Sequence, residues 1–175
     1  MHAASPAGSS QAGNGQFVPA SGTAKNGALF LTYTSRRGGY SISYPGGWRV
    51  TKQGTGVRIG RFGNTIVATV VKRKARPYYK GYQRTLEAQL AKHHPRLISA
   101  IVQPAAQLRV GDQPVTTAVI AQQRPATQSA PAETVITQRF LYWARNRLLI
   151  LSCSSPKGID NSAAYDLIGT LVAWH

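Results

Sequence analysis

The stretch TVITQRFLYWARNRLLILS, residues 134–152, decides the fold. It contains two runs rich in β-branched, aromatic and leucine side chains, residues 134–143 and 147–152, separated only by Ala144-Arg145-Asn146. Runs of this composition favour β-strands, and a short polar connection between two of them predicts a hairpin. The strands of a hairpin are antiparallel, so the stretch predicts an antiparallel sheet.

Further strands are predicted on the N-terminal side of this hairpin. Residues 40–44 and 57–62 alternate apolar and polar side chains, which is typical of strands with one buried face. Residues 65–71 form a β-branched run that predicts a central strand. Additional extended segments are expected at residues 28–31, 48–50, 97–102, 107–110 and 115–122, with a turn at residues 111–113.

One segment between the strands has helical periodicity. Tyr78, Tyr82, Leu86 and Leu90 recur every fourth residue, which predicts an amphipathic helix over residues 78–93. Proline cannot continue a helix, so the helix is expected to end before Pro95.

A second helix is predicted near the C-terminus. It runs over residues 163–172, with Asp160 as its N-cap and an apolar face formed by Ala164, Leu167, Ile168 and Leu171. The whole order, strands, helix, hairpins and closing helix, predicts an α+β fold: a central, mostly antiparallel sheet flanked by helices.

The first 27 residues differ in composition from the rest. They are small, polar and rich in Gly, Ser, Ala and Pro, and such sequence buries too little surface to offset the entropy of ordering. We therefore expect a disordered leader at residues 1–27, followed by a single domain at residues 28–175.

The charge is strongly unbalanced, with 21 Lys and Arg residues against five acids and a net charge of +16. No acid precedes residue 87. Such a field attracts anionic partners, which include nucleic acid, phospholipid headgroups and acidic protein surfaces. The alternative is that the charge is only the background of a basic composition. The five acids are Glu87, Asp112, Glu133, Asp160 and Asp166.

The same composition argues against most catalytic sites. Five scattered acids do not favour a Mg²⁺ or Ca²⁺ site or a glycosidase pair. The single cysteine, Cys153, lies in an apolar run, where a buried structural role is usual. The adjacent His93 and His94 have no second ligand motif, and no G-x-S-x-G elbow occurs. We expect no metal, no cofactor and no enzymatic activity, with a small hydrolase as the remote alternative.

A basic cluster joins the predicted central strand to the first helix, with tyrosines beside it. Cations next to aromatic rings can hold phosphates and stack on bases, so the cluster is the candidate site for an anion or a partner. The alternative is a solvated loop whose tyrosines serve the core. The candidate residues are Lys72, Arg73, Lys74, Arg76, Lys80 and Arg84.

Two terminal motifs resemble a known superfamily. The segment GYSISYPGGW, residues 39–48, is similar to the F-x-I-x-Y-P-x-x-W start of PsbP-like domains. The closing residues LVAW, 171–174, resemble their C-terminal I-x-x-S-F-x-W, with Leu171 and Val172 where Ser and Phe often stand. The resemblance covers about residues 38–174. The superfamily includes the photosystem II extrinsic protein, Mog-type proteins and bacterial lipoproteins of the LpqN and DcrB kinds.

The resemblance implies an α/β/α sandwich and a noncatalytic binding or accessory role toward a protein partner. It also implies an extracytoplasmic, lipoprotein-like setting, which the linker-like leader fits. The sequence departs from that pattern because no lipobox cysteine precedes residue 28. Nonspecific binding of nucleic acid or of an anionic membrane surface through residues 72–80 is the alternative function.

Overall fold

A computed structural model describes residues 18–23 and 29–174 of the chain. Within these residues it contains strands and two helices in the order predicted for an α+β fold. The elements are β1 (Val18–Thr23), β2 (Leu29–Ser35), β3 (Tyr40–Pro45), β4 (Arg49–Gln53), β5 (Gly56–Arg61), β6 (Asn64–Lys72), α1 (Tyr79–Ala91), β7 (Ala100–Val110), β8 (Gln113–Arg124), β9 (Glu133–Ala144), β10 (Arg147–Pro156), α2 (Ser162–Thr170) and β11 (Ala173–Trp174).

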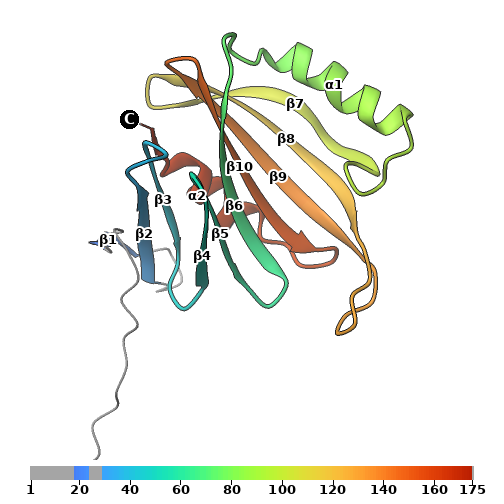
Figure 1. Ribbon diagram of the computed structural model, residues 1–175, viewed down its shortest axis with the longest axis horizontal. Coiled ribbons are helices and arrows are strands. Elements are labelled where there is room, and N and C mark those ends of the chain that lie inside the picture. The colour runs from blue at the N-terminus through green and yellow to red at the C-terminus, as the bar shows by residue number, and fades with distance from the viewer. Residues whose placement is uncertain (1–17, 24–28, 175) are drawn as a thin grey trace, which may run out of the picture.

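The strands form two antiparallel sheets (Figure 1). The seven-stranded sheet has the order β4-β5-β6-β10-β9-β8-β7, and the four-stranded sheet has the order β1-β2-β3-β11. The hairpin predicted from residues 134–152 is confirmed as β9 and β10, at the centre of the larger sheet. The predicted central strand is confirmed as β6, which pairs with β10.

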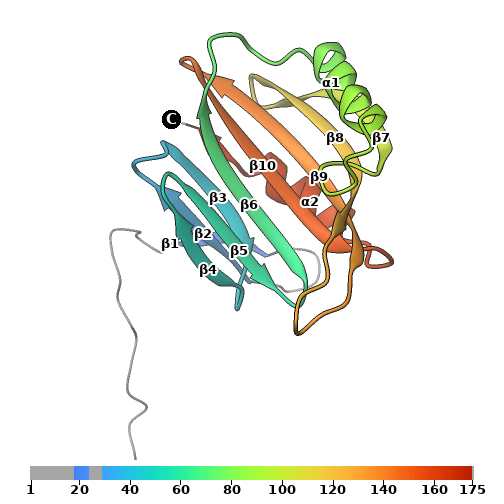
Figure 2. The same ribbon diagram turned by 45° about the vertical axis from the view of Figure 1, so that its right-hand side comes forward.

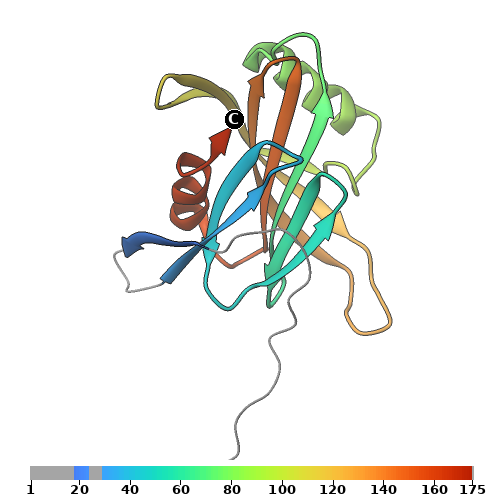
Figure 3. The same ribbon diagram turned by 60° about the vertical axis from the view of Figure 1, so that its left-hand side comes forward.

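The main core lies between the two sheets. The small sheet and α2 cover one face of the seven-stranded sheet, which we call the outer face (Figure 3). Side chains alternate along β10, so Leu149, Leu151 and Cys153 enter this core. Their neighbours Leu148 and Ile150 point to the opposite, inner face. Tyr40 and Ile42 of β3, both fully buried, pack from the small sheet.

Helix α1 lies on the inner face, against β7 and β8 (Figure 2). The predicted helix over residues 78–93 is confirmed, and Leu86 is fully buried against Ile98 and Ile120. Tyr78, however, is 55% exposed, and Tyr79 packs on the core in its place. The reason is local: Tyr78 is the N-cap residue with extended backbone angles, so it precedes the helical repeat.

Helix α2 exists as predicted, but its buried face agrees with the prediction only in part: Leu167 and Ile168 pack on the main core as predicted. Tyr165, Ile168 and Gly169 are buried, while Leu171 is 47% exposed because the helix ends at Thr170. Gly169 sets the rotation of the helix: it lies against Phe140, and the Tyr142 hydroxyl donates a hydrogen bond to its carbonyl.

The turn into α2 also differs from the prediction. Asn161, and not Asp160, is the N-cap residue of the helix. The Asp160 carboxylate accepts hydrogen bonds from the Ser162 backbone N–H and hydroxyl, just outside the helix, and these bonds lower its pKa.

Two other segments extend the predictions. Residues 100–102 and 107–110 of two predicted strands belong to the single strand β7, whereas residues 97–99, predicted as strand, precede it. The register of β7 against β8 is irregular between Ile101 and Ala106. Strand β1 pairs with β2 and falls within residues 1–27, where a disordered leader was expected. Residues 1–17 and 24–28 lie outside the described residues, so the boundary between leader and domain stays a prediction.

We expect the substitution Gly169→Ala to lower the free energy of unfolding by about 1–3 kcal/mol, the usual cost of overpacking a core. A Cβ at this position would lie 2.5 Å from two ring atoms of Phe140, which is itself 1% exposed and enclosed. Urea denaturation of the purified protein measures the change.

Gly81→Ala is the matched control, because it adds the same methyl group to the other helix. A Cβ at Gly81 meets nothing within 4 Å, so only helix propensity changes and stability should rise by up to about 1 kcal/mol. Equal destabilisation by the two substitutions would contradict the described packing of α2 on Phe140.

Candidate functional site

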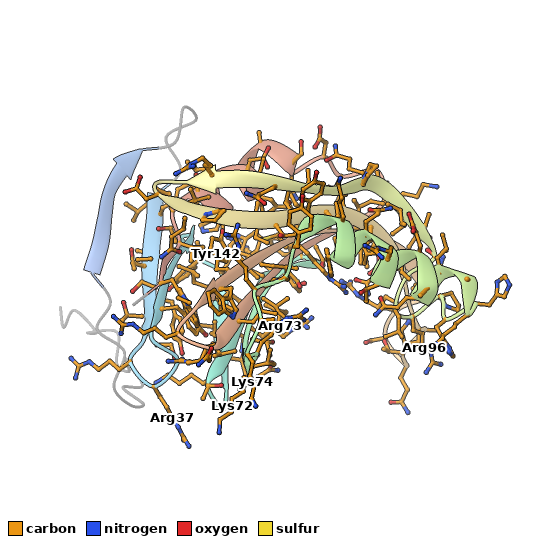
Figure 4. The ribbon with its side chains drawn as sticks, turned by 90° about the horizontal axis from the view of Figure 1, so that it is seen from above. Arg37, Lys72, Arg73, Lys74, Arg96 and Tyr142 are labelled. Atoms are coloured by element: carbon orange, nitrogen blue, oxygen red, sulfur yellow. The ribbon has the colours of Figure 1, made fainter. Side chains whose placement is uncertain are left out.

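The inner face of the seven-stranded sheet is only partly covered. The sheet bends so that α1 lies on the inner side of the bend (Figure 4). The helix packs on β7 and β8 through a separate small core. The inner-face side chains of β9 and β10 lie beyond this core, and a cavity opens between them and α1.

This cavity, which we call the α1 groove, has a volume of about 460 Å³. Its apolar floor is formed by Leu141 of β9 with Leu148 and Ile150 of β10. Leu141 lies directly opposite Ile150 in the antiparallel register, so the floor is continuous across the two strands. The wall is formed by α1, through Gly81, Tyr82, Thr85 and Gln89, and the remaining lining residues are Arg73, Tyr78, Arg139 and Ser152.

Arg139 supplies the charge inside the α1 groove. It lies on β9 opposite Ser152, two residues from Leu141 on the same face, and it is half-buried. Its Nη1 donates a long hydrogen bond of 3.4 Å to the Tyr82 hydroxyl, and its buried Nε has no hydrogen-bond partner. No acid lines the groove, and within the described residues the only salt bridge joins Arg124 to Glu133.

A half-buried guanidinium without an anion is energetically unfavourable, because the charge loses water and gains no compensating partner. Sequence reasoning missed this residue. The signal was present, since Arg139 is the one charged residue of the predicted strand at residues 134–143, but alternation alone did not show which face would be open.

Hydrogen bonds hold the backbone of the predicted basic segment, while its cationic side chains are exposed. The Arg73 backbone N–H donates to the Asn146 carbonyl, the Trp143 indole donates to the Arg73 carbonyl, and the Thr116 hydroxyl donates to the Pro77 carbonyl. These bonds tie residues 73–77 to the large sheet.

Only one of the six predicted site residues, Arg73, lines the α1 groove, and Tyr78 joins it there. The other five, Lys72, Lys74, Arg76, Lys80 and Arg84, are exposed outside it. Figure 4 places Lys72, Arg73 and Lys74 near one another and Arg96 apart from them, beyond the end of α1. The anion-binding role of the six residues stays a prediction.

Two of the five acids lie together on the other face of the large sheet. Asp160 and Asp166 line a different pocket of about 450 Å³ beside α2, whose lining contains no Lys or Arg. Gln138 of β9 lies in this pocket and donates a 2.6 Å hydrogen bond to Asp166. Gln138 and Arg139 are adjacent on one strand, so they point to opposite faces of the sheet. Arg139 and these two acids therefore lie on opposite sides of the large sheet.

The residues considered for catalysis or metal binding do not line the α1 groove. Cys153 is fully buried in the main core, and burial raises the pKa of its thiol. No group of three or more His, Cys, Asp or Glu residues that would suit a metal ion occurs in the part of the chain that the structure describes. In the same part, neither helix is long and apolar enough to cross a membrane.

Comparison with known proteins identifies the fold. Neither a protein-family model nor a curated protein sequence matches the chain. Among solved structures, the chain is similar to cyanobacterial PsbP (CyanoP) from Synechocystis, with 13% identity, a TM-score of 0.60, and coverage of 85% of this chain and 94% of that one. A protein from Bacteroides thetaiotaomicron matches with 14% identity and a TM-score of 0.50 over 82% of this chain, which spans 48% of that structure.

The Ran-binding protein Mog1p of Saccharomyces cerevisiae is also similar, with 11% identity and a TM-score of 0.48 over 82% of this chain and 84% of that one, too low a score to argue from. The similarity to PsbP confirms the expected PsbP-like α+β sandwich. At this level of identity it shows the fold alone. The extracytoplasmic, lipoprotein-like setting stays a prediction.

We expect Arg139→Met to raise the free energy of unfolding by about 1 kcal/mol. Methionine keeps much of the volume but removes the half-buried unpaired charge, and such replacements by apolar residues are often stabilising. Urea denaturation at near-physiological salt measures the change. A loss of stability of similar size would show that the Arg139 charge already has a favourable partner in the free protein.

Proposed function

We propose that this protein is a noncatalytic binding domain whose α1 groove holds an acidic segment of a protein partner. The observation that supports this most directly is Arg139, a half-buried guanidinium with no acidic partner among the described residues, set beside an apolar floor. A carboxylate entering the groove would supply the missing anion and accept charge-assisted hydrogen bonds.

The rest of the groove specifies the kind of segment. Leu141, Leu148 and Ile150 offer apolar surface, so side chains next to the carboxylate should be apolar. The hydroxyls of Tyr78, Thr85 and Ser152 add polar groups along the lining. A volume of about 460 Å³ falls within the usual range of ligand pockets, which suits a few side chains of a bound peptide.

The setting of the groove favours recognition over chemistry. It is lined by one helix, two central strands and the segment that contains Arg73 and Tyr78, and its lining contains no His, Cys, Asp or Glu. The PsbP-like fold agrees with a binding or accessory role. Arg73, Lys74 and Arg76 next to the opening would attract an acidic partner during encounter, an effect that weakens with salt.

A pair of short fluorescent peptides tests the proposal. One alternates Glu with Leu and the other alternates Gln with Leu, and binding to the purified full chain is followed by anisotropy. We expect the Glu peptide to bind more tightly than the Gln peptide. Arg139→Gln should weaken binding of the Glu peptide by about tenfold, because one charge-assisted interaction is lost.

Arg109→Gln is the matched control. It removes the same charge from exposed strand β7, and Arg109 does not line the groove. Equal binding of the two peptides, or equal loss with both variants, would contradict the proposal.

Binding of duplex DNA, measured in the same assay, distinguishes the alternative function from the proposed one. The exposed cations of residues 72–80 and the half-exposed Tyr78 favour nonspecific binding to nucleic acid or to anionic membranes. If DNA binds more tightly than the Glu peptide, and charge reversal at Arg73, Lys74 and Arg76 lowers the salt dependence, that function replaces the one proposed here.

A further inference from the structure

A second basic pocket lies on the sheet at the β5–β6 turn, away from the α1 groove. It has a volume of about 290 Å³, and no acid lines it. We call it the arginine pocket. Four arginines from three strands line it: Arg49 of β4, Arg58 and Arg61 of β5, and Arg124 of β8. The other lining residues are Thr51, Gly60, Phe62, Gly63, Asn64 and Thr65.

The strand register explains why a hollow exists there. Arg49 of β4 lies opposite Gly60 of β5, and Gly60 in turn lies opposite Thr65 of β6. The glycine therefore leaves an empty position between an arginine and a threonine. Glycine is also required by packing, because a Cβ at Gly60 would lie 2.9 Å from the Asn64 carbonyl oxygen.

A neighbouring pair of residues in the β4–β5 register contributes the second arginine of the pocket. Arg58 of β5 lies opposite Thr51 of β4, two residues along from the Arg49 and Gly60 pair. Arg49 and Arg58 are thus diagonal neighbours on one face, close enough for long side chains to meet over the same hollow. Arg124 of β8 approaches from the other side and donates a 3.3 Å hydrogen bond to the Gly63 carbonyl.

The charges of this pocket are largely uncompensated. Arg124 is paired with Glu133, and the Arg61 guanidinium lies over the Phe62 ring at 4.6 Å from its centroid. Arg49 and Arg58 have no acidic partner in the described part of the chain. Like charges brought together without an anion repel each other, and one bound anion would relieve that repulsion for both.

We propose that the arginine pocket binds a phosphate group. Guanidinium groups form paired hydrogen bonds to phosphate oxygens, and the Thr51 and Thr65 hydroxyls are further donors beside the same hollow. A carboxylate has two oxygens and is matched by one guanidinium, whereas arginines converging from separate strands match the several oxygens and higher charge of a phosphate. The phosphate belongs either to a soluble phosphorylated molecule or to a phospholipid headgroup.

The test compares two double variants that remove equal charge. Arg49→Gln with Arg58→Gln removes two exposed arginines of the pocket, and Arg36→Gln with Arg37→Gln removes two exposed arginines of the β2–β3 turn. NMR signals of the arginine Nε–H groups are followed while inorganic phosphate is added. Flotation with phosphatidylcholine vesicles, with and without phosphatidic acid, tests the lipid source.

We expect phosphate to shift the Arg49 and Arg58 signals in the wild type and in the turn variant, and the pocket variant to bind at least about tenfold more weakly. Vesicle binding that needs phosphatidic acid and is lost only in the pocket variant would identify a lipid headgroup. Binding of inorganic phosphate with no binding to the vesicles would identify a soluble ligand. Absence of shifts at both arginines, or equal loss in both variants, overturns the proposal. Arg139 is unchanged throughout, so the peptide assay of the α1 groove is independent of this result.

Discussion

The packing of the small sheet and α2 on the outer face of the seven-stranded sheet is the constraint on which the other features depend. Phe140, Tyr142, Leu149 and Leu151 are buried there, and each such side chain contributes about 1.5–3 kcal/mol. Because side chains alternate along a strand, burying these four residues commits Arg139, Leu141, Leu148 and Ile150 to the inner face. A register slip of one residue would exchange the two sets, so the core fixes the composition of the α1 groove.

The sequence predicted the elements better than their faces. The β9–β10 hairpin, the β6 run and α1 follow from local periodicity and composition, and all three are present. The rotation of α2 could not be predicted, because it depends on contact between Gly169 and Phe140, which are 29 positions apart in the sequence. Tyr78 was placed on the buried face of α1 because four-residue spacing does not reveal where the N-cap lies.

The candidate sites were less predictable, since they depend on non-local pairing. Arg73 was identified from the basic segment, but Arg139 belongs to the same groove only because β10 and α1 lie on either side of it. Likewise, Arg49, Arg58 and Arg124 are scattered in the sequence and come together through the register of β4 with β5 and the approach of β8 to the β5–β6 turn. The composition indicates a positive net charge, but only the fold shows which of these cations lack an acidic partner.

The central claim is that the inner face, with its unpaired cations, is the binding face, and that the acidic pocket beside α2 is not. Side-chain chemical-shift mapping with the Glu–Leu peptide tests this most directly, because the side chains of adjacent strand residues point to opposite faces. We expect the largest shifts along the lining of the α1 groove, at Tyr82, Arg139, Leu141 and Ile150. Shifts concentrated at Ile159, Asn161 and Ser162 of the pocket beside α2 would contradict the claim.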